Sequence, residues 1–268
     1  MCTLTFAWEV FPETPLVVAA NRDELLDRPS SGPERVGGEP AVVAPRDGEA
    51  NGTWIGYNEH GLFAGITNRW TGRDREGDRS RGLLLRDVLD HETAAAAARF
   101  VERELDERVY EGFNLVVVDG FAGLGSIPDR FAGLPVAERD DPAAAILVEY
   151  DGNHRSRVLE PGVHVVVNVG ADGQYVMPEG YEKPASAQAE NADRLSAEFT
   201  PEPGETALAW RDRAAETIRD HEYGVCVHRD GFGTRSSSLL SFGEGGVRYQ
   251  YADGPPCENE YVDVDASM

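Results

Sequence analysis

The sequence predicts an α+β fold built on antiparallel sheets. Strand-like runs come first, then helix-like segments, then strands, helices and strands again, and this order does not alternate as a parallel sheet with crossover helices requires. With 268 residues, 41% of them hydrophobic, the chain can bury one large core. We expect a four-layer αββα sandwich, with two antiparallel sheets between two helical layers, as a single domain over residues 1–256. Residues 257–268 are acidic and are expected to form a loose tail.

The first third of the chain is expected to be β-rich. Residues 3–9 and 16–21 are short apolar runs on either side of a turn-like segment, which indicates an N-terminal hairpin. A loop rich in Ser, Pro and Gly is expected over residues 28–40. Further strands are expected at 41–44, 53–57 and 62–67.

The remaining two thirds mix helices with strands. An alanine-rich, charged stretch at 93–109 has the period of an amphipathic helix, and the leucines of 83–89 suit a buried one. Two more helices are expected at 185–198 and 206–221. Strands are expected at 114–119, 145–150, 155–159, 164–168, 225–228, 234–242 and 247–251.

The composition excludes several classes of partner. The net charge is -23, the acidic residues are spread along the whole chain, and Lys183 is the only lysine. Such acidity is typical of proteins from salt-accumulating microbes, where salt screens the self-repulsion. It disfavours nucleic acid, which needs a basic surface, and anionic membranes. The sequence shows no apolar run long enough to span a bilayer and no secretory signal, so we expect a cytoplasmic protein.

Metal and dinucleotide chemistry is not expected. The six histidines lack the spacing of a metal site, and no Cys-x-x-Cys is present. The three cysteines are too scattered for a disulfide framework. Cys226 lies in an apolar run and is expected in the core, whereas Cys257 follows two prolines and is expected to be exposed.

The start of the chain carries a candidate nucleophile. Cys2 follows Met1 directly, and its side chain is small enough for the initiator methionine to be trimmed. A trimmed chain would present both a thiol and a free α-amine on Cys2, and the amine can take the thiol proton. A cysteine can also stand at this position by chance, so the hypothesis depends on the residues around it.

Four polar residues follow the second strand of the predicted hairpin. Asn21, Arg22, Asp23 and Glu24 form an ordinary solvated turn in one interpretation. If the two strands pair, however, Arg22 and Asp23 return to the neighbourhood of Cys2. A carboxylate there can orient the α-amine, and a guanidinium can lower the pKa of the thiol or hold an anionic group of a substrate.

Three more candidates lie at strand ends. Asn68 and Asn168 each close an apolar run and are candidate donors to an oxyanion, although capping a strand is the commoner use of such a residue. Arg235 enters a strand after a glycine-rich turn and is a candidate anion clamp. A phosphate loop is a weaker interpretation of that turn, since the lysine and helix of the motif are missing.

Seven short motifs occur along the chain in the same order as in a known protein family. The chain resembles the NRDE family, whose animal members are called transport and Golgi organisation protein 2, over most of its length. The motifs are Met-Cys at 1–2, Asn-Arg-Asp-Glu at 21–24, Gly-Thr-Trp-Ile-Gly at 52–56, Thr-Asn at 67–68, Ser-Arg-Gly at 80–82, Gly-Phe-Asn-Leu at 112–115 and Gly-Thr-Arg-Ser-Ser at 233–237. The chain departs from the family pattern at Asn51, where a glycine is usual.

The resemblance implies a fold and a site. The NRDE family is similar to N-terminal nucleophile (Ntn) hydrolases of the choloylglycine hydrolase and acyltransferase branch, in which an N-terminal cysteine attacks an amide. Carried over by motif, the catalytic set is Cys2, Arg22, Asp23, Asn68, Asn168 and Arg235. Substrate-binding roles are expected for Asn21, Glu24, Trp54 and Arg235.

Two functions remain open at this point. In the first, Cys2 is the nucleophile of an amidohydrolase or acyltransferase acting on a small amide or thioester substrate, without a cofactor. In the second, which the resemblance to the animal members implies, the same pocket binds or carries a hydrophobic anion such as haem, acyl-CoA or a lipid. The sequence has no dedicated axial-ligand motif for haem.

Overall fold

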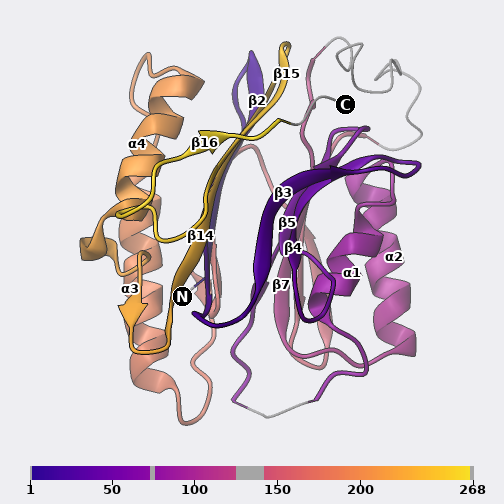
Figure 1. The fold of residues 1–268 in the computed structure, drawn as a ribbon, viewed down its shortest axis with the longest axis vertical. Helices are drawn as coiled ribbons and strands as arrows, with labels where there is room; N and C mark the ends of the chain where they lie inside the picture. Colours follow the sequence, from indigo (N-terminus) through magenta and orange to yellow (C-terminus); the bar gives the residue numbers. More distant parts are fainter. Residues whose placement is uncertain (1, 73–75, 125–141, 266–268) are drawn as a thin grey trace.

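The chain folds into four layers. The computed structural model describes residues 2–72, 76–124 and 142–265, so Met1 and residues 266–268 of the expected tail lie outside the described part. Over these residues the strands form two antiparallel sheets, with one pair of helices on the outer face of each. Figure 1 shows α3 and α4 on one side, α1 and α2 on the other, and the two sheets between them. The predicted αββα sandwich is confirmed.

The first sheet contains the N-terminal hairpin. β1 (Thr3–Phe11) pairs with β2 (Thr14–Leu25) in a register that sets Thr3 opposite Asn21. Because Cys2 precedes Thr3, this register brings it beside the residues that follow Asn21. The other strands of this sheet are β10 (Gly162–Val167), β11 (Gly170–Ala171), β12 (Gln174–Tyr175), β13 (His228–Arg229), β14 (Phe232–Gly243), β15 (Gly246–Ala252) and β16 (Val262–Asp263).

The second sheet is a meander in sequence order. Its strands are β3 (Ser30–Val36), β4 (Val42–Asp47), β5 (Ile55–Asn58), β6 (Leu62–Asn68), β7 (Phe113–Asp119), β8 (Ala145–Tyr150) and β9 (His154–Val158). The interior strand β7 is buried along its whole length, in keeping with its nearly continuous apolar sequence. A tight turn joins β5 to β6, with Gly61 at a positive φ of 76°.

Side-chain caps mark the start of both helices on the second sheet. Ser80 caps α1 (Arg81–Val88) and Thr93 caps α2 (Ala94–Glu107), each accepting a hydrogen bond from a backbone amide of the first turn. The other helices are α3 (Glu182–Glu198), α4 (Ala207–Arg219) and the 3₁₀ turn η2 (His221–Tyr223). In the described part of the chain, no helix has both the length and the apolar character needed to cross a membrane.

The main core fills the space between the sheets. Leu4 and Val18 of the first sheet meet Phe63 and Val116 of the second, and Phe242 makes edge contacts with several aromatic rings there. Burial of this apolar area on both inner faces is the main force that holds the sheets together. The site described below lies at one end of this interface.

Three segments differ from the sequence-based expectation. The expected loop over 28–40 contains β3. This strand lies at the edge of its sheet and is partly exposed, so it can hold the proline and charged residues that suggested a loop. The strand expected at 225–228 is reduced to the start of β13, because the Val225 carbonyl accepts the side-chain amide of Asn21 instead of a strand partner. In the tail expected to be loose, β16 pairs with β15, and Val264 packs against the core between the sheets.

Candidate active site

A pocket opens where the two sheets and α1 meet. Its walls come from the β1–β2 hairpin and β14 of the first sheet, from β4, β5 and β6 of the second, and from the first turn of α1. Its volume is about 120 Å³, which is below the roughly 300–1,000 Å³ of pockets that enclose a drug-sized ligand. The polar residues on its walls are Cys2, Thr3, Asn21, Arg22, Asp23, Glu24, Arg28, Asp47, Thr53, Thr67, Asn68, Ser80, Arg81, Ser236 and Ser238.

Cys2 lies half-buried in the wall of this pocket, against the next strand. The backbone amide of Asp23 donates a hydrogen bond to its Sγ, and Sγ lies equally close, at 3.4 Å, to the Asp23 carbonyl oxygen. Burial and the nearby charge of Asp23 raise the pKa of the Cys2 thiol above its ordinary value. A protonated thiol of this kind needs a base before it can act as a nucleophile.

Asp23 is a buried carboxylate held in a fixed orientation. The Thr234 hydroxyl on β14 donates a 2.6 Å hydrogen bond to Asp23 Oδ1, and Thr234 in turn accepts one of 2.9 Å from the amide of Val227. Burial raises the pKa of Asp23, and the hydrogen bond from Thr234 acts in the opposite direction. The alternative that residues 21–24 form a solvated turn is wrong, because β2 continues through them and three of the four are buried.

Arg22 offers an unused donor. Its Nη2 lies 3.2 Å from Asp47 and 3.4 Å from Glu24, and its guanidinium lies 4.1 Å from the ring centre of Trp54. Its Nη1 is buried and has no hydrogen-bond partner among the residues that the structure describes. A buried charged donor without an acceptor is costly, so this atom is a strong candidate to receive an anionic or carbonyl oxygen of a ligand.

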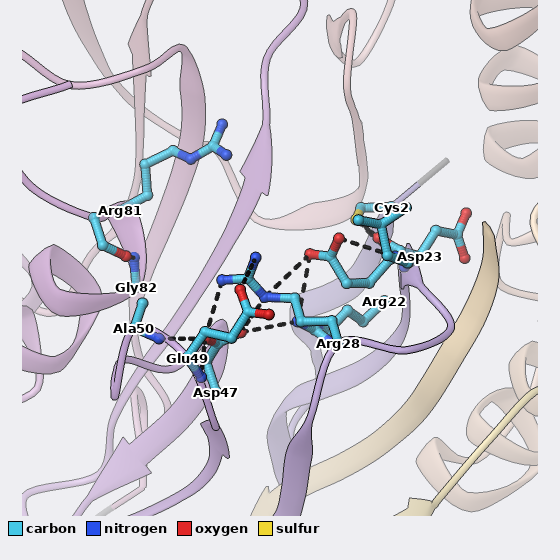
Figure 2. Close-up of polar contacts among 12 residues, drawn as sticks. Cys2, Arg22, Asp23, Arg28, Asp47, Glu49, Ala50, Arg81 and Gly82 are labelled. Carbon is cyan, nitrogen blue, oxygen red and sulfur yellow. Dashed lines mark hydrogen bonds and ion pairs between the residues drawn. The ribbon is translucent and has the colours of Figure 1, made fainter. Parts of the chain in front are cut away.

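Asp47 was not among the residues singled out from the sequence, yet it joins the polar groups of this wall. Arg28 donates to both of its oxygens, at 2.6 and 3.0 Å, and the amides of Glu49 and Ala50 donate to Oδ1. Figure 2 shows this network running from the β4 turn to Arg22, with Cys2 and Asp23 at its far end. The only sequence signal was its place at the end of an apolar run, which many carboxylates share.

The two predicted asparagines lie together but do different things. Asn68 ends β6, is exposed and lines the pocket. Asn168 is buried behind it, donates a 2.8 Å hydrogen bond to the Asn68 carbonyl and accepts one from Gln188. Asn168 is not part of the pocket wall. The geometry therefore leaves the Asn68 side chain facing the pocket and gives Asn168 a supporting position.

Asn21 and Arg235 were predicted to bind substrate, but the contacts of Asn21 are structural and Arg235 lies outside the pocket wall. Asn21 Nδ2 donates to the carbonyls of Ile218 and Val225, and its Oδ1 accepts from Ser237, so its buried amide joins α4 to the sheet. Arg235 stands in the irregular stretch between Thr234 and Ser236 on β14 and is not part of the pocket wall. Glu24 and Trp54 do line the pocket.

Arg81 is a further cation that the sequence signalled only through a family motif. It is the first residue of α1 and reaches the pocket wall, and its guanidinium donates to the Gly112 carbonyl at 2.9 Å and pairs with Glu111 at 2.7 Å. The amide of Thr53 donates to the Gly82 carbonyl, which fixes this turn against the segment before β5 that carries Trp54. The site thus combines a thiol, a buried carboxylate, an amide and several guanidinium groups in one small pocket.

Comparison with solved structures supports this fold. The structure of penicillin V acylase from Agrobacterium tumefaciens superposes with a TM-score of 0.54 at 15% sequence identity, covering 99% of this chain and 87% of that one. At this identity the likeness concerns the fold alone. The four-layer arrangement is that of the Ntn hydrolases, as the resemblance implied.

Sequence relatives extend over nearly the whole chain. The bovine (Bos taurus) transport and Golgi organization protein 2 homolog is 25% identical over 264 residues, covering 90% of this chain and 88% of its own length. The human (Homo sapiens) homolog is 25% identical over 261 residues, with the same coverage. The sequence profile of the family described as Transport and Golgi organisation 2 matches residues 1–252. The chain therefore belongs to this family, which is the NRDE family that its motifs resemble.

Proposed function

We propose that this protein is an N-terminal cysteine amidohydrolase or acyltransferase that acts on a small amide or thioester. The observation that carries the proposal is the position of Cys2 Sγ in the pocket wall, 3.4 Å from the Asp23 amide nitrogen and next to the buried Asp23 carboxylate. A nucleophile beside a carboxylate that can orient its base is the arrangement that acyl transfer requires. The fold shared with a penicillin acylase is compatible with this chemistry but does not establish it.

The proposed reaction begins once Met1 has been removed. The α-amine of Cys2 takes the thiol proton, and Asp23 stabilises the ammonium that forms. The thiolate attacks the carbonyl carbon of the substrate, and the oxyanion accepts hydrogen bonds from Asn68 and from backbone donors near it. As the intermediate collapses, the C–N or C–S bond breaks, the ammonium gives its proton to the leaving group, and an acyl thioester remains on Cys2.

The second half of the reaction releases the acyl group. Water, or an amine in the acyltransferase case, attacks the thioester while the α-amine accepts its proton. The proton returns to Sγ as the product leaves, and the free enzyme is restored. Throughout, Arg22 Nη1 is the group that we assign to a polar or anionic substituent of the acyl donor, because it is buried and lacks an acceptor among the described residues.

The pocket volume limits the substrate. A cavity of about 120 Å³ encloses the reacting end of a molecule, so a larger donor must extend out of it. The same limit weighs against the alternative function, a carrier of haem or of another large hydrophobic anion held within the pocket. Among the pocket-lining residues, Cys2 is the one side chain of a type that ligates haem iron. Haem and acyl-CoA binding remain predictions of the alternative.

The test compares turnover with binding. The purified protein without Met1 is incubated with N-acyl amides and acyl thioesters, and release of the amine or thiol is followed together with intact mass. We expect turnover and an acyl adduct on Cys2, both abolished in Cys2→Ala while the circular dichroism spectrum is retained. Undiminished turnover by Cys2→Ala would refute the mechanism. Tight, stoichiometric haem binding that is lost in Arg22→Gln, without any turnover, would favour the carrier.

A further inference from the structure

Four potential metal ligands meet at a place remote from the pocket. They are His221 in η2, Cys226 in the connection that follows, His228 at the start of β13, and Cys257 in the segment between β15 and β16. One ligand atom from each lies within 4.8 Å of every other. None of the four lines the pocket that holds Cys2.

Three of the four ligand atoms lie about as close together as the ligands of a small tetrahedral ion. Cys226 Sγ lies 3.4 Å from Cys257 Sγ, Cys257 Sγ lies 3.1 Å from His228 Nε2, and Cys226 Sγ lies 3.7 Å from the same nitrogen. Zinc bonds of about 2.3 Å to sulfur and about 2.0–2.1 Å to nitrogen place tetrahedral ligand atoms roughly 3.3–3.8 Å apart. The fourth ligand, His221, has its ring centre 5.0 Å from that of His228, and its ligand atom lies within 4.8 Å of the other three.

We propose that His221, Cys226, His228 and Cys257 form a structural zinc site. Two thiolates and two imidazoles are a soft and borderline donor set that selects zinc over magnesium or calcium. Four protein ligands close the coordination sphere, which is the pattern of structural rather than catalytic zinc. This proposal is independent of the proposed function and replaces the expectation that the chain has no metal site.

An acidic partner behind one ligand supports the assignment. Glu258 Oε1 lies 3.8 Å from His228 Nδ1, the ring nitrogen on the side away from the two sulfur atoms. At this distance the carboxylate makes no hydrogen bond to Nδ1, but its negative charge faces the positive charge of a metal-bound histidine. Because Glu258 follows Cys257 directly in the chain, one segment supplies both a zinc ligand and the carboxylate near His228.

The site joins the C-terminal segment to the elements that orient Asp23. Between the ligands Cys226 and His228, Val227 exchanges two backbone and side-chain hydrogen bonds with Thr234, of 2.8 and 2.9 Å. Thr234 is the residue that holds the Asp23 carboxylate. Zinc would therefore link Cys257, and the strand β16 that follows it, to the segment around Val227 that positions Asp23 through Thr234. Binding would stabilise both segments.

The alternative to zinc binding at Cys226 and Cys257 is a disulfide bond between them. Both cysteines are free, and their 3.4 Å separation exceeds a covalent S–S bond of about 2.05 Å. A disulfide would also leave His221 and His228 without a reason to converge on the same point. The test below separates the two outcomes.

The experiment measures metal content and geometry in the full-length protein, purified with reductant and without added chelator. Elemental analysis is expected to find one zinc per chain. After the zinc is removed and replaced with Co²⁺, the intense visible bands of tetrahedral cobalt and a thiolate charge-transfer band are expected. Cys226→Ser and Cys257→Ser should each lose the zinc, and Cys2→Ser is the matched control that should keep it.

Four results would overturn the proposal, the last of them a disulfide between the two cysteines. One is zinc at background in the reduced wild-type protein. Another is a weak, octahedral cobalt spectrum, and this measurement needs no variant, so it decides the matter even if the serine variants fail to fold. The third is equal zinc content in Cys226→Ser and Cys2→Ser. Peptide mapping that finds Cys226 bonded to Cys257 in protein without zinc would assign the pair to the disulfide instead.

Discussion

The amide nitrogen of Asp23 lies 3.4 Å from the sulfur of Cys2, so a single residue of β2 contacts the thiol through its backbone and raises its pKa through its side chain. This contact follows from the hairpin register, in which Thr3 is opposite Asn21. The hydrogen bond from Asp23 holds the Cys2 thiol against β2, the strand that also carries Arg22. The predictions below test what each neighbour contributes.

Arg22→Gln should weaken substrate binding. The variant removes the buried Nη1 donor that has no acceptor among the described residues. A charged hydrogen bond contributes about 1.5–3 kcal/mol, so KM for an acyl donor with an anionic substituent should rise about 10- to 100-fold. Steady-state kinetics check this, with Arg46→Gln on the exposed side of β4 as the matched control. An equal KM in both variants would argue against the assignment.

Asn68→Ala should slow the chemical step more than it weakens binding. Loss of one oxyanion donor lowers kcat by about 10²- to 10³-fold, with little change in KM. Asn168→Ala should cost less in kcat, because Asn168 acts through the Asn68 carbonyl, and more in stability, because Gln188 loses its acceptor. Asn153→Ala, in an exposed turn, is the control. A larger kcat loss in a well-folded Asn168→Ala than in Asn68→Ala would reverse the two roles.

Asp47→Asn should destabilise the protein in a pH-dependent way. Burial acts to raise the pKa of Asp47, but hydrogen bonds from Arg28 and the charge of Arg22 outweigh it and lower this pKa overall. A carboxyl group with a lowered folded pKa contributes stability that is complete above its unfolded pKa of about 3.9. That stability is lost as pH falls through the folded pKa. The variant should therefore lose about 1.5–3 kcal/mol at neutral pH.

The check is urea unfolding of wild type and variant from pH 7 down to pH 3 at constant salt. The difference between their free energies of unfolding should stay level above pH ~4 and shrink below it. Asp27→Asn, which alters an exposed carboxylate on the same turn as Arg28, is the matched control and should change little. A difference that stays constant through the acid range would show that Asp47 does not contribute through its charge.

The sequence predicted the fold and the centre of the site for identifiable reasons. Two apolar runs separated by a short turn indicated a hairpin, and pairing of its strands returns Arg22 and Asp23 to Cys2. Each of these steps depends on residues close together in the chain, where period and turn chemistry are reliable guides. The same local logic failed for β3, because an edge strand tolerates the residues that normally mark a loop.

The parts that the sequence could not predict depend on distant contacts. Asp47 and Arg81 reach the pocket from the second sheet and from α1. The residues next to them in the chain do not indicate that either one lies near Cys2. Arg235 is left outside the pocket wall by a register shift in β14 that no local pattern reveals. The cysteines 226 and 257 come together only because β14, β15 and the segment after them fold back past η2.

The most direct test of the central claim is the mass of the N-terminal tryptic peptide from protein purified from its own host after brief exposure to an acyl donor. The first basic residue is Arg22, so this peptide ends there. We expect a peptide that begins at Cys2 and carries an acyl group on its thiol. A peptide that still begins with Met1 would contradict the account, because the amine that should activate Cys2 would be locked in a peptide bond.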